Sequence, residues 1–463
     1  MPRDEREVRH IAVLTPQGAP YLGRWWWPDD PKHIVGGQLA LQDEVWRLTL
    51  FGWLGPWDLK KSEFVPTLLH GEIGGTPITA MDLVPAGWSA HETHCGLNTV
   101  LVGGHFDGSL RVERAQLGLH NLNEWANRQP WTMNHEGPSD DEPARDTVTF
   151  TPPEVKTTEF EGTKISLERT WQQQSGLSMV KTESHEALIL TFRTPVDLEE
   201  LLHDWVRPFL GLLELAANSP SAVLDLTIWT PGDDDLRTGL NVLSSVSRRS
   251  EQPVRNWFQM LFLLSDVGFE SFVPGFLALH KELGTVFDLM TAIKGRGYVS
   301  NQFMAAASAV EAYHRRQFGK GEASKDHKEL LARVVSAAPP ADQAWLKEQL
   351  RFSHEPTFAE RINAVIERAG PLFPGLVGNV AKWSKWVKDG RNSIAHRDPT
   401  MLDIDGQWRI TIRFTETIRW LLILTLLRDL GINDEVIEAR VRQERGLESA
   451  REHLKEAMPD WFG

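Results

Sequence analysis

The sequence lacks the residues and segments that define several large classes of protein. Cys95 is its one cysteine among 463 residues, so a disulfide framework is excluded and a reducing compartment is expected. The longest apolar run, Trp420 to Leu427, is far shorter than the ~20 residues that cross a bilayer. The first ten residues, MPRDEREVRH, contain no apolar stretch of the kind that follows the charged start of a signal peptide. We therefore expect a soluble, cytoplasmic protein without a membrane partner.

Basic charge is also scarce. The net charge is −14, with 49 Lys and Arg against 63 Asp and Glu, which argues against a protein that coats nucleic acid nonspecifically. No Walker-type phosphate loop, GxSxG elbow or HExxH motif occurs, and each of these would have indicated a particular enzyme class. With 41% apolar and 24% charged residues, the composition is that of a globular protein, and the length predicts two or three domains.

The first part of the chain has the pattern of antiparallel β structure. Short runs such as Trp46 to Phe51, Thr99 to Val102 and Val223 to Trp229 are rich in β-forming residues, and Gly-Gly or Gly-Pro turns separate many of the strands. The acidic, proline-containing segment HEGPSDDEPAR indicates an exposed loop or a subdomain joint near residues 135–147.

Helical periodicity replaces strand signals beyond about residue 250. Phe303, Ala306, Ala307, Val310 and Tyr313 recur at helical spacing. The segment from Phe414 to Leu430 is apolar almost all round, which predicts a helix buried in a bundle or at a subunit contact. The fold class is therefore α+β multidomain, with a β-rich antiparallel domain at 1–265 followed by an all-α bundle at 266–463.

The most informative motif is Arg391-Asn392-Ser393-Ile394-Ala395-His396. An arginine can neutralise a phosphate and a histidine can move protons near neutral pH. These two groups suffice for phosphodiester cleavage when RNA supplies its own 2′-hydroxyl, and the chemistry then needs no metal or cofactor. The bare spacing R-x4-6-H also occurs elsewhere in this chain, so the context decides. That context includes a local basic patch: Lys382, Lys385, Lys388 and Arg397.

The region around this motif resembles the HEPN superfamily of ribonucleases. The segments ASAVEAYHRRQ and FSHEPTFAERINAVIERAG resemble helices that precede the motif in HEPN proteins allied to ApeA, an abortive-infection effector. In the N-terminal part, GRWWWPDD, GGQLALQDEVWRLTLFGWL, LVGGHF and LGLHNLNEWA resemble the order of elements in the ApeA N-terminal domain.

This resemblance implies a function and a set of site residues. By this resemblance Arg391 and His396 would be catalytic and Asn392 would support them. The local basic patch, independently of the resemblance, suggests Lys385, Lys388 and Arg397 as substrate-binding residues. The expected activity is metal-independent RNA cleavage in anti-phage abortive infection, with tRNA as one candidate substrate. The resemblance further implies a homodimer in which two motifs meet across a two-fold axis, and a β domain that senses an unknown trigger.

Several alternatives remain open from the sequence. The helical domain could be a non-catalytic module that binds nucleotide or RNA or only dimerises, and the tryptophan-rich β domain could be a carbohydrate or peptide receptor. Trp25, Trp26 and Trp27 could stack bases, although core packing is the commoner role of such a cluster. His91, His94, Cys95 and His105 include zinc-ligand types, but without the paired spacing of structural zinc sites. His314, Arg315 and Arg316 suit a helix C-terminus and could also line an RNA cleft.

Overall fold

In the computed structural model the chain forms two compact units. The first comprises Met1–Glu214, Ser221–Arg255 and Phe269–Pro274, and the second comprises Leu215–Pro220, Asn256–Gly268 and Gly275–Gly463. The domain boundary at 265/266 stays a prediction. The described residues are 20–42, 45–52, 54, 68–89, 91–108, 110–136, 145–176, 179–232, 239–244, 253–295, 297–319, 321, 323–396, 403–404 and 406–462.

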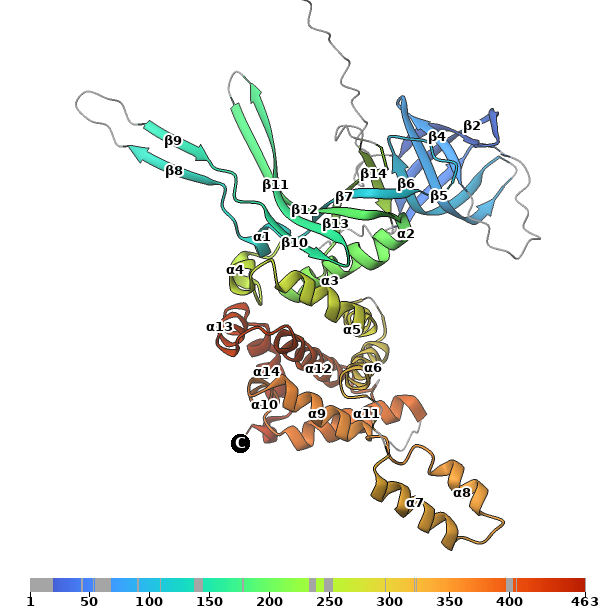
Figure 1. Ribbon diagram of the computed structural model, residues 1–463, viewed down its shortest axis with the longest axis vertical. Helices are drawn as coiled ribbons and strands as arrows, with labels where there is room; N and C mark the ends of the chain where they lie inside the picture. The colour runs from blue at the N-terminus through green and yellow to red at the C-terminus, as the bar shows by residue number, and fades with distance from the viewer. Residues whose placement is uncertain are drawn as a thin grey trace, which may run out of the picture. The chain divides into compact units, whose positions relative to one another are not determined.

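The first unit is built from antiparallel strands (Figure 1), which confirms the predicted fold class of this part. Its strands are β1 (Tyr21–Trp27), β2 (Asp30–Gln42), β3 (Val45–Leu50), β4 (Leu69–Ile73), β5 (Thr76–Trp88), β6 (Thr93–Val102), β7 (Arg111–Leu119), β8 (Trp131–Glu136), β9 (Arg145–Phe150), β10 (Lys156–Phe160), β11 (Thr163–Gly176), β12 (Met179–Asp197), β13 (Val223–Trp229) and β14 (Leu240–Ser244). Between them lie α1 (Leu122–Ala126), α2 (Leu198–Glu200), the π-helix η1 (Leu201–Val206) and α3 (Arg207–Ala217).

Six of these strands close into a barrel in the order β3-β2-β1-β4-β5-β6, because β6 pairs with both β5 and β3. Trp25 is fully buried in its core. A Cβ on Gly71 would lie 2.4 Å from the Trp25 ring, so only glycine leaves room for this indole. One edge of β6 is divided: Thr93 to Leu97 pair with β3, and Thr99 to Val102 pair with β14. β6 is therefore shared between the barrel and the open part of the sheet.

The open part continues as β14-β13-β7-β12-β11-β10, and β8 pairs with β9 in a separate two-stranded sheet. The β8–β9 and β11–β12 hairpins extend away from the rest of the unit (Figure 1). Within β12, Glu186 is buried and accepts hydrogen bonds from two guanidinium groups, those of Arg128 and Arg169. The predicted loop or joint at residues 135–147 falls at the β8–β9 hairpin, and its residues 137–144 lie outside the described residues.

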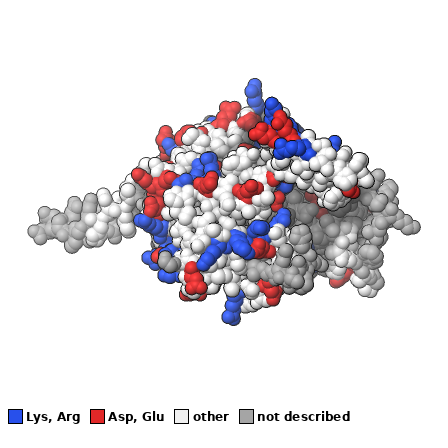
Figure 2. Space-filling model, turned by 90° about the horizontal axis from the view of Figure 1, so that it is seen from below, with Lys and Arg blue, Asp and Glu red and all other residues white. Residues whose placement is uncertain are grey.

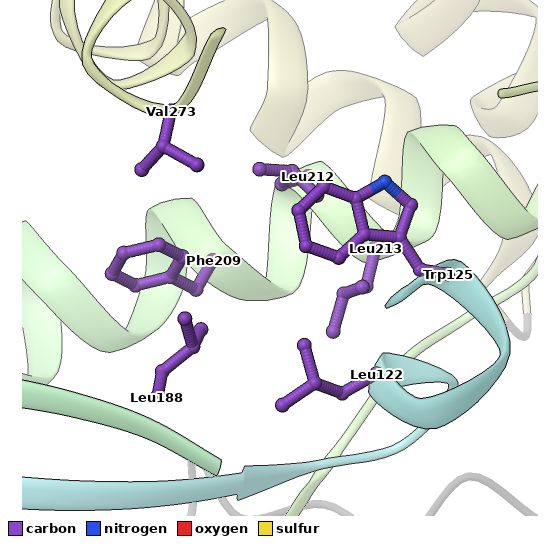
Figure 3. A pocket seen from close by; sticks show the side chains of 7 residues that line it. All are labelled: Leu122, Trp125, Leu188, Phe209, Leu212, Leu213 and Val273. Carbon is purple, nitrogen blue, oxygen red and sulfur yellow. The ribbon is translucent and has the colours of Figure 1, made fainter. Parts of the chain in front are cut away.

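An apolar cluster joins the sheet to the helices of this unit (Figure 3). It is too narrow to hold a water molecule and is therefore close-packed core rather than a binding pocket. The lining side chains come from α1, β12, α3 and the start of α5 (Phe272–Lys294), whose residues up to Pro274 belong to this unit: Leu122, Trp125, Leu188, Phe209, Leu212, Leu213 and Val273.

The second unit is helical, as predicted. Its elements are η2 (Trp257–Gln259), α4 (Leu264–Val267), α5 (Phe272–Lys294), α6 (Val299–Gln317), α7 (Lys325–Ala337), α8 (Gln343–Gln349), α9 (Phe358–Ala369), α10 (Leu372–Val377), α11 (Val380–His396), α12 (Trp408–Asp429), α13 (Asp434–Glu444), α14 (Gly446–Ala457) and η3 (Pro459–Trp461). α12 is buried over most of its length and packs against α6, α9, α10 and α14. In the part of the chain that the structure describes, no helix combines the length and apolarity of a membrane span.

α12 begins at Trp408, six residues before the predicted Phe414. α11 contains the whole motif and ends at His396. Gly390 lies inside α11 and is buried. A Cβ there would lie 3.0 Å from Ile404 and 3.1 Å from Phe303. Gly390 thus serves close packing inside the helix.

Candidate functional site

Helix α11 carries the motif and is held by its buried face. Asn379 caps its first turn by accepting a hydrogen bond from the Lys382 backbone at 2.9 Å. Trp383 is buried and its indole N–H donates to Thr417 of α12 at 2.9 Å. Trp386 stacks on Phe414 with ring centroids 3.6 Å apart. These contacts fix the rotation of α11 and therefore the position of Arg391 near its end.

The Arg391 side chain extends from α11 to contact residues of α6 and α9. Its guanidinium group donates to Glu311 of α6 and to the side chain of Asn392, in both cases at 3.4 Å. It also lies over the ring of Phe358 at the start of α9, 5.6 Å from the centroid. The side chain is 31% exposed. Arg391 is therefore oriented by the protein but still accessible to a ligand.

The Glu311 carboxylate belongs to a chain of ion pairs that continues from Arg391. Arg315 contacts Glu311 at 3.3 Å and Glu355 at 3.6 Å, and Glu355 contacts Arg361 at 3.1 Å. We call these five residues the ion-pair ladder. It contains three arginines and two glutamates, so it carries one net positive charge, and its most exposed members are Arg315 and Arg391.

His314 lies beside the ladder rather than in solvent. It is 5% exposed, and its Nδ1 lies 3.5 Å from the guanidinium group of Arg361. Burial and the charges of Arg361 and Arg315 lower the pKa of His314. The histidine of the HRR triplet is thus a core residue, whereas Arg315 and Arg316 are exposed.

The other predicted site residues lie on α11 or directly after it in the sequence. Lys385 and Lys388 are exposed on α11, and Lys385 pairs with Asp389 at 2.5 Å. His396 is the last residue of α11, and its side chain is not among the described ones. Arg397 lies outside the described residues. On the face shown in Figure 2, charges of both signs are interspersed.

Two family models match the chain. One, described as ApeA N-terminal domain 1, matches residues 20–274, more than half of the sequence. The other, described as Apea-like HEPN, matches residues 304–436. The chain belongs to the ApeA-like HEPN family. No curated protein and no solved structure matches it.

The HEPN match contains every member of the ion-pair ladder. Glu311, Glu355 and Arg361 were not among the residues predicted from the sequence. The spacing of Glu311 and Arg315 (i, i+4) on a predicted helix is a signal for their mutual pairing. No local pattern indicates that Glu311 reaches Arg391, because that contact joins residues far apart in the chain.

The zinc-ligand types of the ApeA N-terminal domain are not brought together. Cys95 is buried in the barrel core, whereas the preceding His94 contacts Thr49 and Glu92 at the surface, because successive side chains of a strand point to opposite faces. His105 donates from Nε2 to the Gly71 carbonyl at 2.8 Å and stacks on His70. Within the described residues, no group of three potential metal ligands is found.

The three consecutive tryptophans have different environments. Trp25 is in the barrel core, and Trp27 donates from its indole to the Leu54 carbonyl at 2.6 Å. Trp26 lies edge-on to His70 and His105, with ring centroids 6.5 and 5.3 Å apart. Two of the three therefore serve barrel packing, which is the commoner role expected for such a cluster.

Proposed function

We propose that the HEPN domain is a metal-independent endoribonuclease with Arg391, Asn392 and His396 in its active site. The RNA 2′-oxygen attacks the adjacent phosphorus and loses its proton, the bond from phosphorus to the 5′-oxygen breaks, and that oxygen takes up a proton. The products are a 2′,3′-cyclic phosphate and a free 5′-hydroxyl. His396 acts as the base or the acid, and Arg391 binds the phosphate.

The accessible guanidinium group of Arg391 is the observation that carries this proposal. A guanidinium has five N–H donors, and strong charge-assisted contacts are ~2.7–2.9 Å long. The contacts of Arg391 to Glu311 and Asn392 are both 3.4 Å. They hold the side chain but are too long to saturate its donors, so a phosphate can still bind.

The exposed lysines of α11 support an RNA-binding role for the same helix. Lys385 and Lys388 are exposed and lie six and three residues before Arg391 on the helix. We propose that they and Arg397 bind the RNA backbone. Phosphate contacts of this kind position a nucleic acid without selecting its sequence.

The position of the motif on α11 supports a homodimer. Two residues five apart on a helix differ by about 140° around its axis and ~7.5 Å along it, so they do not form a neighbouring pair of the i, i+4 kind. Arg391 and His396 have this separation. We propose that two copies of the chain meet with their motifs facing, and that each copy completes the other's site.

We further propose that the protein acts in anti-phage defence by cleaving RNA after activation, with tRNA as one candidate substrate. An unregulated ribonuclease would harm its own cell, so control is required. The ApeA N-terminal domain is the part proposed to sense the phage or cellular trigger. The protein would then be a two-part effector, with a sensing β domain and a cleaving helical domain.

The experiment compares the ends of RNA from phage-challenged cells that express the wild type, His396→Ala, Arg391→Gln or the control His453→Ala. His453 lies on α14. We expect new 5′-hydroxyl and cyclic-phosphate ends in the wild type and control, with a decrease of about 10²–10⁴-fold in His396→Ala. Purified active protein should retain cleavage in EDTA. Equal ends in all four strains would refute the proposal, and RNA binding without cleavage would favour the non-catalytic module.

A further inference from the structure

The ion-pair ladder places a second accessible arginine beside Arg391. Arg315 is 43% exposed, more than any other ladder residue. It contacts the same Glu311 carboxylate as Arg391, one through each oxygen: Oε1 for Arg315 and Oε2 for Arg391. The two guanidinium groups are therefore one carboxylate apart.

The Glu311 carboxylate resembles a phosphate in how it is held. It is an anion bound by two arginines, and its contacts of 3.3 and 3.4 Å are longer than the ~2.7–2.9 Å of strong charge-assisted bonds. Such partly exposed pairs stabilise a fold by only ~0–1 kcal/mol. A ligand with more negative charge can therefore replace the carboxylate at small cost.

The rest of the ladder fixes Arg315 from its other side. Glu355 contacts both Arg315 and Arg361, and Arg361 is buried, with its Nε donating to the Pro356 carbonyl at 2.9 Å. Arg315 thus retains an anionic partner when Glu311 moves away. Its guanidinium group stays near Arg391, which limits the conformational entropy lost on binding.

We propose that Arg315 and Arg391 bind neighbouring phosphates of one RNA strand, and that Glu311 occupies the space between them until RNA displaces it. This inference rests on the proposed ribonuclease function. It adds a phosphate-binding residue on α6 to the motif on α11, and it makes Glu311 a competitor of the substrate. RNA, with a phosphate at every nucleotide, can occupy both arginines at once.

The test measures binding of a fully 2′-O-methylated RNA decamer, which has no free 2′-hydroxyl to attack, at several salt concentrations. Each phosphate contact on a single strand contributes about 0.7 to the slope of log affinity against log salt. Arg315→Gln is expected to lower affinity about tenfold, the effect of one charge-assisted contact, and to reduce the slope by about 0.7. Glu311→Gln should bind more tightly than wild type.

Arg316→Gln is the matched control, because it removes the same charge from the next residue of α6. Arg315→Lys retains the charge and should retain the slope, and thermal melting of each variant verifies that it is folded. Equal effects of Arg315→Gln and Arg316→Gln, or none from Arg315→Gln, would overturn the inference. Weaker binding by Glu311→Gln would overturn its role as a competitor. An unchanged slope in Arg391→Gln as well would count against the proposed function itself.

Discussion

Replacement of the buried Glu186 by glutamine is expected to destabilise the β-rich unit strongly. The Glu186 side chain is fully buried, and it accepts hydrogen bonds from Arg128 at 3.1 Å and from Arg169 at 2.7 and 2.9 Å. Arg128 and Arg169 are themselves only 13% and 7% exposed. Glutamine has nearly the same shape, but it is neutral and would direct an N–H₂ group at two guanidinium groups.

The size of the effect follows from the two cations that would remain. Removal of one partner from a buried ion pair costs about 3–5 kcal/mol, because an uncompensated charge stays in the interior. For a unit of this size, each kcal/mol lowers the melting temperature by about 2–4 °C. The melting temperature of the β-rich unit should therefore fall by roughly 6–20 °C in Glu186→Gln.

Differential scanning calorimetry of the full chain measures this change. The control is Glu113→Gln, which makes the same substitution at an exposed position of β7. It should change the free energy of unfolding by no more than ~0.5 kcal/mol. A shift of similar size in both variants would refute the reasoning, since the loss would then come from net charge alone. An unchanged transition in Glu186→Gln would show that the two arginines need no buried counter-charge.

Three further predictions concern the helical unit. The pKa of His314 is lowered in the folded state, so the unfolded chain binds a proton at this residue more readily. The stability of the helical unit should therefore fall as the pH decreases below about 6.5. In thermal melts from pH 7.5 to 5.5, His314→Gln should reduce this pH dependence. In urea unfolding, Gly390→Ala should lower the free energy of unfolding by about 1–2 kcal/mol, because the added Cβ would crowd Phe303. Gly375→Ala should raise it by up to ~1 kcal/mol, because nothing lies within 4 Å of the added Cβ. Trp386→Ala should cost about 3 kcal/mol by the same measurement, and a loss below ~1 kcal/mol would contradict its packing role.

Local patterns in the sequence predicted many elements of the fold. The strand expected at Val223 to Trp229 coincides with β13, because a short run of β-forming residues lies between clear turn signals. The helix start at Trp408 was missed because Gln407, a weak N-cap without a side-chain cap bond, follows an Asp-Gly turn. Closure of the barrel was not predicted either, because the pairing of β3 with β6 depends on long-range contacts that no local pattern records.

The candidate site shows the same limit. Arg391, Asn392 and the exposed lysines of α11 were predicted from one continuous segment and its resemblance to HEPN proteins. The partners of Arg391 come from α6 and α9, and only folding brings Glu311 and Phe358 to it. The sequence therefore identified the helix that carries the motif, whereas the charges that surround its arginine required the structure.

The division of β6 between two partners determines which fragments of this protein can be handled alone. Thr99 to Val102 complete their hydrogen bonding through β14, which enters the sheet only after the helices α2 and α3 and the strand β13. A fragment that ends before Leu240 would leave the amides and carbonyls of this stretch as an open edge, and such edges recruit strands from other chains. We therefore expect shorter fragments to aggregate even when they contain all six barrel strands.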